Sequence, residues 1–361
     1  MTDEMYMRRA LRLAGRGRGG VSPNPMVGAV IVKGSRVVGE GYHRRAGDRH
    51  AEIVALDEAG KKAKNSTMYV NLEPCSHYGK TPPCVGRIIE AGVRRVVVAM
   101  KDPNPLVCGK GISKLKRAGV LTELGLFGEE AGRLNEVFVK FTREGVPFVI
   151  VKSAMTLDGK IATVQGDSKW ISCEKARRFT HRLRSGVDGI LVGINTVVED
   201  NPMLNVRHGK CSSQPVKIVV DSRCRIPVNS RVFTGGRTIV AVTKGCSSGK
   251  TKELHNKTGA EVLVVKGNGA RVDLKELMDE LGKRQVMSLL IEGGGELAAS
   301  AFSCGIVDKL FFFIAPRIVG GRCAPTPVGG EGIDRIGEAV KVSRMTARRF
   351  GEDILVEGYL N

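Results

Sequence analysis

The sequence predicts an α/β protein built from two domains. Its 361 residues exceed the ~100 to 200 residues of a common single domain. Short apolar segments typical of strands alternate with segments of helical periodicity along the chain. The series restarts after Gly145-Val146-Pro147, where glycine and proline favour a linker. We therefore expect a first domain at residues 1–145 and a second at residues 146–361.

The first domain is expected to be a three-layer α/β/α sandwich. A charged amphipathic helix is predicted within residues 1–20, and it lacks the apolar core of a signal peptide. Further helices are predicted to begin at Ala51, at Cys84 directly after a proline, and over residues 129–142. The expected strands lie at residues 27–32, 36–41, 67–72, 95–99 and 121–123.

The second domain is predicted to hold another α/β series. Its most informative element is residues 289–299, in which an apolar strand runs into Gly293-Gly294-Gly295 and then into a helix. Backbone N–H groups and the helix dipole converge at such a turn, so it can bind a pyrophosphate. Tight packing is the alternative explanation for these glycines. The expected strands lie at residues 148–151, 189–192, 217–220, 238–242, 262–265, 287–291 and 309–314.

Four residues of the first domain predict a metal-dependent hydrolytic deaminase. His50, Cys75 and Cys84 are ligand types that Zn²⁺ prefers, and three of them leave the fourth tetrahedral position open for water. Glu52 lies two residues after His50 and is placed to carry a proton from that water to a departing amine. Any one of these residues alone is better explained as a buried cysteine or a surface histidine. As an ordered set they indicate a catalytic zinc site.

The cysteine spacing departs from the general deaminase signature, which has Pro-Cys-x-x-Cys, because residues 76–83 separate Cys75 from Cys84. This longer loop resembles that of the bacterial bifunctional riboflavin-biosynthesis deaminase-reductases. Motifs at residues 23–30 and 101–105 resemble the deaminase half of that family. The reductase half is matched by residues 152–154, 158–162, 168–172, 200–202 and 291–294.

The resemblance implies a cytidine-deaminase-like first domain and a second domain similar to dihydrofolate reductase. It implies two reactions with Zn²⁺ and NADPH as cofactors. The first is deamination of 2,5-diamino-6-(5-phosphoribosylamino)pyrimidin-4(3H)-one. The second is NADPH-dependent reduction of the ribosyl group of the product, 5-amino-6-(5-phosphoribosylamino)uracil, to ribityl.

The resemblance also implies the positions that contact ligands in the second domain. Without it, the arginines are better explained as surface residues, and Trp170 as a partly buried aromatic. Cofactor contacts are expected at Ala154, Trp170, Thr196, Asp200, Ser222, Gly294 and Gly295. Substrate contacts are expected at Ser168, Arg184, Leu204, Arg207 and Glu292.

Polar loop residues of the first domain are candidates for holding the deaminase substrate, because functional groups concentrate on loops beside a rigid scaffold. A solvated loop is the alternative for Lys80, and a surface position or indirect contact is the alternative for His43 and His77. The candidates are Asn24, His43, His77, Lys80, Asp102 and Asn104.

The net charge of +20 and the isoelectric point near 9.8 indicate anionic partners. Aromatic residues make up only 5% of the chain, with one Trp and five Tyr, so platforms for stacking unpaired bases are scarce. We therefore expect a phosphorylated pyrimidine substrate and no specific nucleic acid. A nucleic-acid adenosine or cytidine deaminase with an unrelated second domain is the rival enzyme. A zinc-stabilised RNA-binding module is the non-catalytic rival, and Glu52 argues against it because a structural zinc site needs no proton carrier.

Cysteine content and hydropathy indicate the compartment in which the protein is expected. Seven of the nine cysteines lie scattered along the chain beyond the two predicted zinc ligands, which is typical of a reduced cytoplasm. No apolar run approaches the ~20 residues needed to span a bilayer. A homo-oligomer is expected.

Two glycine motifs that resemble nucleotide-binding loops are not expected to bind nucleotide. Residues 15–20 follow a helix and should end it, and residues 245–251 have the wrong glycine spacing for a phosphate loop.

Overall fold

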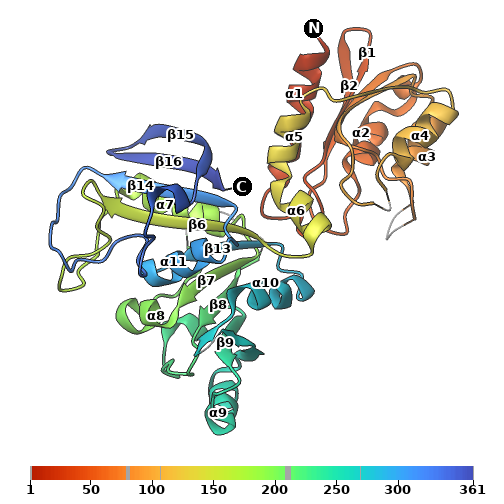
Figure 1. The fold of residues 1–361 in the computed structure, drawn as a ribbon. Helices are drawn as coiled ribbons and strands as arrows, with labels where there is room; N and C mark the ends of the chain where they lie inside the picture. Colours follow the sequence, from red (N-terminus) through yellow and green to blue (C-terminus); the bar gives the residue numbers. More distant parts are fainter. Residues whose placement is uncertain (1, 79–81, 106, 208–212, 269, 361) are drawn as a thin grey trace. The chain divides into compact units, whose positions relative to one another are not determined.

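The structure is a computed structural model, and it describes residues 2–78, 82–105, 107–207, 213–268 and 270–360. The chain divides into two compact units, unit 1 (Met1–Gly145) and unit 2 (Val146–Asn361) (Figure 1). None of the helices in the described part of the chain is long and apolar enough to cross a membrane.

Unit 1 is a five-stranded sheet with helices on both faces. The strand order is β2-β1-β3-β4-β5, in which β3, β4 and β5 are parallel and β1 is antiparallel to both of its neighbours. In chain order the elements are α1 (Asp3–Ala14), β1 (Gly28–Lys33), β2 (Arg36–Tyr42), α2 (Ala51–Ala59), β3 (Thr67–Leu72), α3 (Cys84–Glu90), β4 (Arg95–Met100), α4 (Lys110–Arg117), β5 (Leu121–Leu124), α5 (Gly128–Leu134) and α6 (Glu136–Glu144).

Helices cover both faces of the sheet of unit 1. Successive residues of a strand point to opposite faces, so each strand contributes side chains to both apolar cores. Ala29 and Ile31 belong to the apolar core shared with α2, α3 and α4. Val30 and Val32 belong to the core shared with α1 and α5. The predicted α/β/α sandwich is therefore confirmed, and α1 ends at Ala14, where the predicted glycine run begins.

The single helix predicted over residues 129–142 is wrong, because the structure divides it into α5 and α6 at Asn135. The backbone of Asn135 leaves the helical region with φ −106° and ψ 23°. Its side-chain Oδ1 accepts from the Met26 N–H at 2.8 Å and its Nδ2 donates to the Met26 carbonyl at 3.0 Å. This tertiary pairing with a loop fixes Asn135 outside a continuous helix.

Unit 2 is built on a nine-stranded sheet in the order β10-β9-β8-β7-β13-β6-β14-β16-β15. In this spatial order, neighbouring strands from β10 through β14 are parallel. The strand β16 is antiparallel to both β14 and β15. In chain order the elements are β6 (Phe148–Thr156), α7 (Glu174–Arg184), β7 (Gly189–Gly193), α8 (Ile194–Asp200), β8 (Val216–Val220), β9 (Thr238–Thr243), α9 (Ser248–Thr258), β10 (Glu261–Val265), β11 (Gly267–Asn268), β12 (Arg271–Val272), α10 (Leu274–Lys283), β13 (Ser288–Glu292), α11 (Gly295–Ser303), β14 (Lys309–Ala315), β15 (Val342–Phe350) and β16 (Asp353–Leu360).

Apolar cores lie on both faces of this sheet. One core includes side chains of α10 and α11, and the other includes side chains of α8 and α9. Because β6, β7, β8, β9 and β13 are parallel, the turns that follow them meet at one edge of the sheet. Ligands bind at such carboxyl edges in open α/β sheets. All seven strands predicted for unit 2 are present, and β11, β12, β15 and β16 were not predicted.

Candidate functional site

The three predicted metal ligands converge in unit 1 from three elements. His50 is the residue that precedes α2, Cys84 is the first residue of α3, and Cys75 lies in the loop that follows β3. The Nδ1 atom of His50 lies 3.2 Å from the Cys84 sulfur and 3.6 Å from the Cys75 sulfur. Among the described residues these three are the one group of His, Cys, Asp and Glu close enough to hold a metal ion together.

The three groups shift one another's pKa values. A hydrogen bond with Cys84 and another with His50 lower the pKa of Cys75 to about 4. The hydrogen bond with Cys75 and burial raise the pKa of Cys84, so the pair shares one proton. The hydrogen bond with Cys75 raises the pKa of His50. Metal binding would displace these protons, because zinc takes thiolates and neutral imidazole.

Glu52 lies in the first turn of α2, where its side chain is only 3% exposed. Burial is the main reason that the pKa of its carboxyl group is raised to about 7, and the nearby Cys75 contributes. Its carboxyl group also contacts the Cys84 thiol. A buried carboxylate beside three ligand atoms has access to any small molecule bound among them.

Glu73 holds the loops around this centre, and the sequence analysis missed it. It follows β3 and is 3% exposed. Its Oε1 accepts from the N–H groups of Gly111 and Ile112 at 2.9 and 3.1 Å, and its Oε2 accepts from those of Gly109 and Asp102 at 2.9 and 3.2 Å. The signal was present as an acidic residue at the end of a buried strand, directly before the Pro-Cys pair.

The structure brings several predicted substrate-holding residues next to the ligands. The Asn24 Nδ2 and His43 Nε2 atoms are 3.0 Å apart, and the His43 and His50 rings are 5.6 Å apart in an edge-on arrangement. His43 is buried, and this burial lowers its pKa, so the surface alternative for His43 is wrong. Asp102 lies near Cys75 and His77, and burial raises its pKa.

Asp102 connects two of the remaining candidates of unit 1 to this region. His77 is exposed, and the Asn104 N–H donates to the Asp102 Oδ1 at 2.8 Å. Lys80 lies outside the described residues.

In unit 2, the predicted glycine turn joins β13 to α11, as expected. The Gly294 N–H donates to the Thr196 Oγ1 of α8 at 3.2 Å. A Cβ added at Gly294 would meet only that oxygen, at 3.9 Å, whereas one at Gly295 would meet the Thr326 carbonyl at 2.4 Å. Gly295 therefore serves packing, and Gly294 leaves open space above the backbone.

Two predicted substrate contacts bind each other at the end of β13. The Arg184 Nε and an Nη donate to the two carboxylate oxygens of Glu292 at 2.7 and 2.8 Å. The Arg184 side chain is 14% exposed, so the surface alternative is wrong for this arginine. Lys152 lies close enough for its charge to act on Glu292, and burial lowers its pKa. A lysine directly after the apolar run at residues 148–151 was the signal that could have identified Lys152.

The other predicted contacts of unit 2 lie on several different elements. Trp170 is 61% exposed with the Arg177 guanidinium 4.7 Å from its ring centroid, so the partly buried alternative is wrong. The Leu204 side chain is buried in the apolar core that includes residues of α8. Ala154 lies in β6, Ser168 lies in a loop, Asp200 ends α8, and Arg207 is exposed with its N–H donating to His181.

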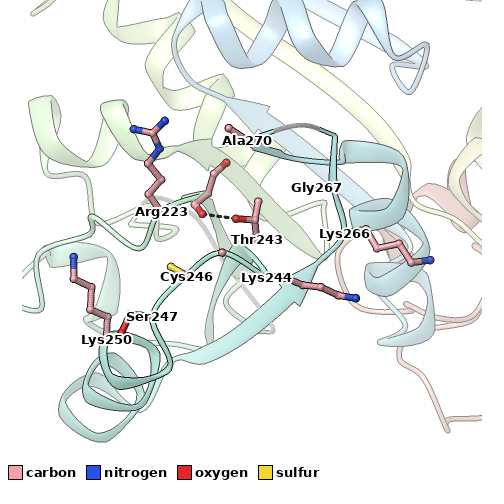
Figure 2. Close-up of a pocket in the computed structure, with 11 residues that line it drawn as sticks. Arg223, Thr243, Lys244, Cys246, Ser247, Lys250, Lys266, Gly267 and Ala270 are labelled. Atoms are coloured by element: carbon pink, nitrogen blue, oxygen red, sulfur yellow. Dashed lines mark hydrogen bonds between the residues drawn. The ribbon is translucent and has the colours of Figure 1, made fainter.

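Ser222 opens onto a cavity of about 780 Å³ at the ends of β8, β9 and β10 (Figure 2). Its hydroxyl accepts from the Val272 N–H at 3.1 Å, and its carbonyl accepts from the Thr243 hydroxyl at 2.9 Å. None of the described residues that line the cavity is acidic. The cationic lining residues are Arg223, Lys244, Lys250 and Lys266.

The segment at residues 245–251, which the sequence analysis rejected as a nucleotide site, contributes Gly245, Cys246, Ser247 and Lys250 to this cavity. Residues 245–247 connect β9 to α9, and residues 248–251 form the first turn of that helix. The glycine spacing of the segment still differs from that of a phosphate loop, so that motif remains absent. The basic cavity arises from tertiary packing of several turns, which linear spacing does not report.

Comparisons with known proteins cover both units. Residues 147–356 match the family described as "RibD C-terminal domain", and residues 1–100 match the "Cytidine and deoxycytidylate deaminase zinc-binding region". The chain is 45% identical to the riboflavin biosynthesis protein RibD of Actinobacillus pleuropneumoniae over 99% of this chain and 95% of that protein. It is 41% identical to the RibD protein of Escherichia coli K12, with 98% of each chain covered.

Solved structures show the same likeness. The chain aligns with Acinetobacter baumannii RibD, form 1, at a TM-score of 0.89 and 35% identity over 99% of both chains. A second similar structure, from Thermotoga maritima, is named as a diaminohydroxyphosphoribosylaminopyrimidine deaminase/5-amino-6-(5-phosphoribosylamino)uracil reductase. It aligns at a TM-score of 0.87 and 33% identity over 99% of this chain and 98% of that one.

Proposed function

The chain belongs to the RibD family of bifunctional riboflavin-biosynthesis enzymes, and we propose that unit 1 carries the deaminase and unit 2 the reductase. The substrate of unit 1 is the diaminohydroxyphosphoribosylaminopyrimidine. Unit 2 reduces the resulting 5-amino-6-(5-phosphoribosylamino)uracil. The observation that carries the proposal is the convergence of His50, Cys75 and Cys84 beside the buried carboxylate of Glu52.

The ligand atoms fit Zn²⁺ in kind and in spacing. Zinc bonds of about 2.1 Å to nitrogen and 2.3 Å to sulfur at tetrahedral angles separate the nitrogen from each sulfur by roughly 3.6 Å. The His50 Nδ1 atom lies 3.2 and 3.6 Å from the two sulfurs. The set has three members among the described residues, which suits a catalytic site with one open position.

Within this site each side chain has a separate task. When bound, Zn²⁺ supplies the positive charge that makes water acidic enough to act as a nucleophile near neutral pH. The Glu52 carboxylate takes the proton of the attacking water and returns it to the departing amino nitrogen, so that ammonia leaves. Asn24 and His43 form a hydrogen-bonded pair at the wall next to His50 and orient the pyrimidine ring. Glu73 keeps Asp102 close to Cys75.

Reduction is assigned to the carboxyl edge of the sheet in unit 2. When bound, NADPH supplies the hydride that opens the ribosyl ring. The open backbone at Gly294 and the Thr196 hydroxyl are placed to hold its pyrophosphate. The Arg184–Glu292 pair is placed to bind the ribosyl phosphate portion of the substrate, with Lys152 adding a positive charge.

The basic cavity at Ser222 favours NADPH over NADH. Two strand spacings, roughly 10 Å, separate β13 from β8, which an extended dinucleotide can span. The cavity then receives the adenosine end of the cofactor, and its cations bind the additional phosphate that distinguishes NADPH.

Arg223→Ala and Lys244→Ala are each expected to raise the KM for NADPH roughly fivefold to tenfold, because each removes a charge facing that phosphate. The KM for NADH should change much less. Lys252→Ala, on α9 but outside the cavity lining, is the matched control. Steady-state reductase assays with both cofactors measure the effect, and equal changes for NADPH and NADH would contradict this role of the cavity.

The proposed function is tested by incubating the purified chain with the diaminopyrimidine ribosyl phosphate, with and without NADPH. Ammonia release without NADPH, and ribityl product only with NADPH, is the expected result. Failure to release ammonia in the zinc-loaded protein would contradict the deaminase assignment.

The rival nucleic-acid deaminase is tested in parallel with single-stranded RNA and DNA. The charge of +20 supports weak nonspecific binding that falls steeply with added salt, because counterion release drives such contacts. Salt-resistant, sequence-selective binding accompanied by base deamination would favour the rival.

Two further properties are part of the proposal. We place the enzyme in the cytoplasm, and the eight cysteines in the described part of the chain, all free thiols, support a reducing compartment. We expect a homo-oligomer, which sedimentation of the purified chain can measure.

A further inference from the structure

Two cysteines meet beside the basic cavity of unit 2. Cys224 lies in the turn after β8, and Cys246 lies in the turn after β9, the strand paired in parallel with β8. The two thiols are in side-chain contact, and both pack against the same apolar cluster. Cys246 also lines the cavity, where Figure 2 shows its sulfur.

The backbone holds both turns in place. The Cys224 N–H donates to the Asp221 carbonyl at 3.1 Å, and the Cys246 N–H donates to the Thr243 carbonyl at 3.1 Å. The turns are joined to each other because the Thr243 N–H and hydroxyl both donate to the Ser222 carbonyl, at 3.3 and 2.9 Å. The closeness of the thiols is therefore a property of the folded backbone.

The two half-buried thiols differ in their position relative to the cavity. Burial is the main cause that raises the pKa of Cys224 to about 11, with contributions from Cys246 and Asp221, while Lys250 acts in the opposite direction. Cys246 borders the cavity, so a small oxidant meets it first. A thiol that a small oxidant can reach, next to a second thiol that can react with the sulfenic acid, is the arrangement found in reversible thiol switches.

We propose that Cys224 and Cys246 form a reversible disulfide under peroxide and that this bond weakens NADPH binding in the adjacent cavity. The proposal rests on the assignment of the reductase to unit 2 and adds a regulatory modification to it.

The chemistry balances with hydrogen peroxide as the oxidant. The Cys246 sulfur attacks one peroxide oxygen, an S–O bond forms as the O–O bond breaks, and one water leaves with the thiol proton. The Cys224 sulfur then attacks the sulfenic sulfur of Cys246. The S–S bond forms, the S–O bond breaks, and the second water takes the Cys224 proton. Two thiols lose two electrons and one peroxide becomes two waters.

The disulfide is expected to affect cofactor binding by moving residues that line the cavity. An S–S bond of about 2.05 Å is much shorter than a contact between two thiols, so forming it turns both side chains and pulls the two turns toward each other. The same turns carry Arg223 and Lys244, and Lys250 lies in the first turn of α9, which directly follows the turn that holds Cys246. Displacing cations that face the cofactor phosphate is expected to weaken NADPH binding at least fivefold, in the usual range for coupled sites.

The experiment uses the full chain, first reduced and then treated with hydrogen peroxide. Peptide mapping after alkylation should recover a Cys224–Cys246 linked pair, and titration with NADPH should show the loss of affinity, reversed by dithiothreitol. NADPH binding is the readout because peroxide can also oxidise the thiols of the zinc site. Cys224→Ser should bind NADPH like the reduced parent and ignore peroxide, whereas Cys323→Ser, at an exposed thiol of unit 2, should respond like the parent.

Absence of the linked pair, or a linked pair with unchanged NADPH affinity, would overturn the proposal. A reduced parent that binds NADPH tightly and a Cys224→Ser variant that still loses affinity under peroxide would overturn it too. Failure of the reduced parent to bind NADPH at all would instead reject the reductase assignment, which separates the two conclusions.

Discussion

Glu52→Gln is expected to retain zinc while deamination falls by about 10²- to 10⁴-fold, the usual range for loss of a general acid–base group. Glutamine has nearly the same shape as glutamate, so the 3% exposed position beside Cys84 stays filled. It cannot accept the proton of the attacking water. Zinc content of the purified variant and ammonia release at saturating substrate measure the two effects.

Variants of the zinc ligands are expected to behave differently from Glu52→Gln. Cys75→Ser and Cys84→Ser should lose both zinc and deamination, because a neutral hydroxyl is a poor replacement for a thiolate. Glu58→Gln, on the exposed side of the same helix, is the matched control and should behave like the parent. Deamination near the parent rate in Glu52→Gln would remove Glu52 from the proposed role.

The sequence was sufficient for features that repeat along the chain or that need rare residue types. The buried strands of both sheets were predicted because parallel strands covered on both faces are nearly continuous apolar runs. The convergence of His50, Cys75 and Cys84 was predicted because few other roles require those types in that order. The glycine turn after β13 was predicted from its strand and helix flanks.

Features set by distant contacts could not be predicted in this way. Asn135 interrupts a helical pattern because its amide pairs with Met26, more than a hundred residues earlier. The acidic residue Glu73 is visible after a buried strand in the sequence, but its role in holding loops depends on four backbone donors that only the fold brings together. The strand β15 is mostly exposed and rich in arginine, as suits an edge strand, so it has no apolar pattern to detect.

Distant contacts also explain why the exposure of some side chains was predicted wrongly. The sequence favours a surface position for Arg184 because arginines are mostly exposed. Only the structure shows that two nitrogens of Arg184 donate to the Glu292 carboxylate. The basic cavity combines turns that follow three different strands, and no linear motif contains all of its cations.

Gly294→Val is expected to weaken NADPH binding by about tenfold or more, because a side chain there fills the space through which the pyrophosphate approaches the backbone. The backbone at Gly294 has φ −60° and ψ 160°, which valine also adopts, and an added Cβ meets only the Thr196 hydroxyl at 3.9 Å. The variant should therefore fold, unlike one at Gly295, where the Thr326 carbonyl would lie 2.4 Å from the new atom.

Calorimetric titration with NADPH and an unfolding midpoint for each variant separate binding from stability. Gly337→Val is the matched control, because that glycine also lies in unit 2 with open space around it. In Gly294→Val the aminouracil ribosyl phosphate should accumulate unreduced while ammonia release continues at the parent rate, since the zinc site lies in unit 1. A folded Gly294→Val protein that binds NADPH as tightly as the parent would show that the cofactor pyrophosphate does not lie on this turn. The reductase would then need a different phosphate site at the carboxyl edge of the sheet.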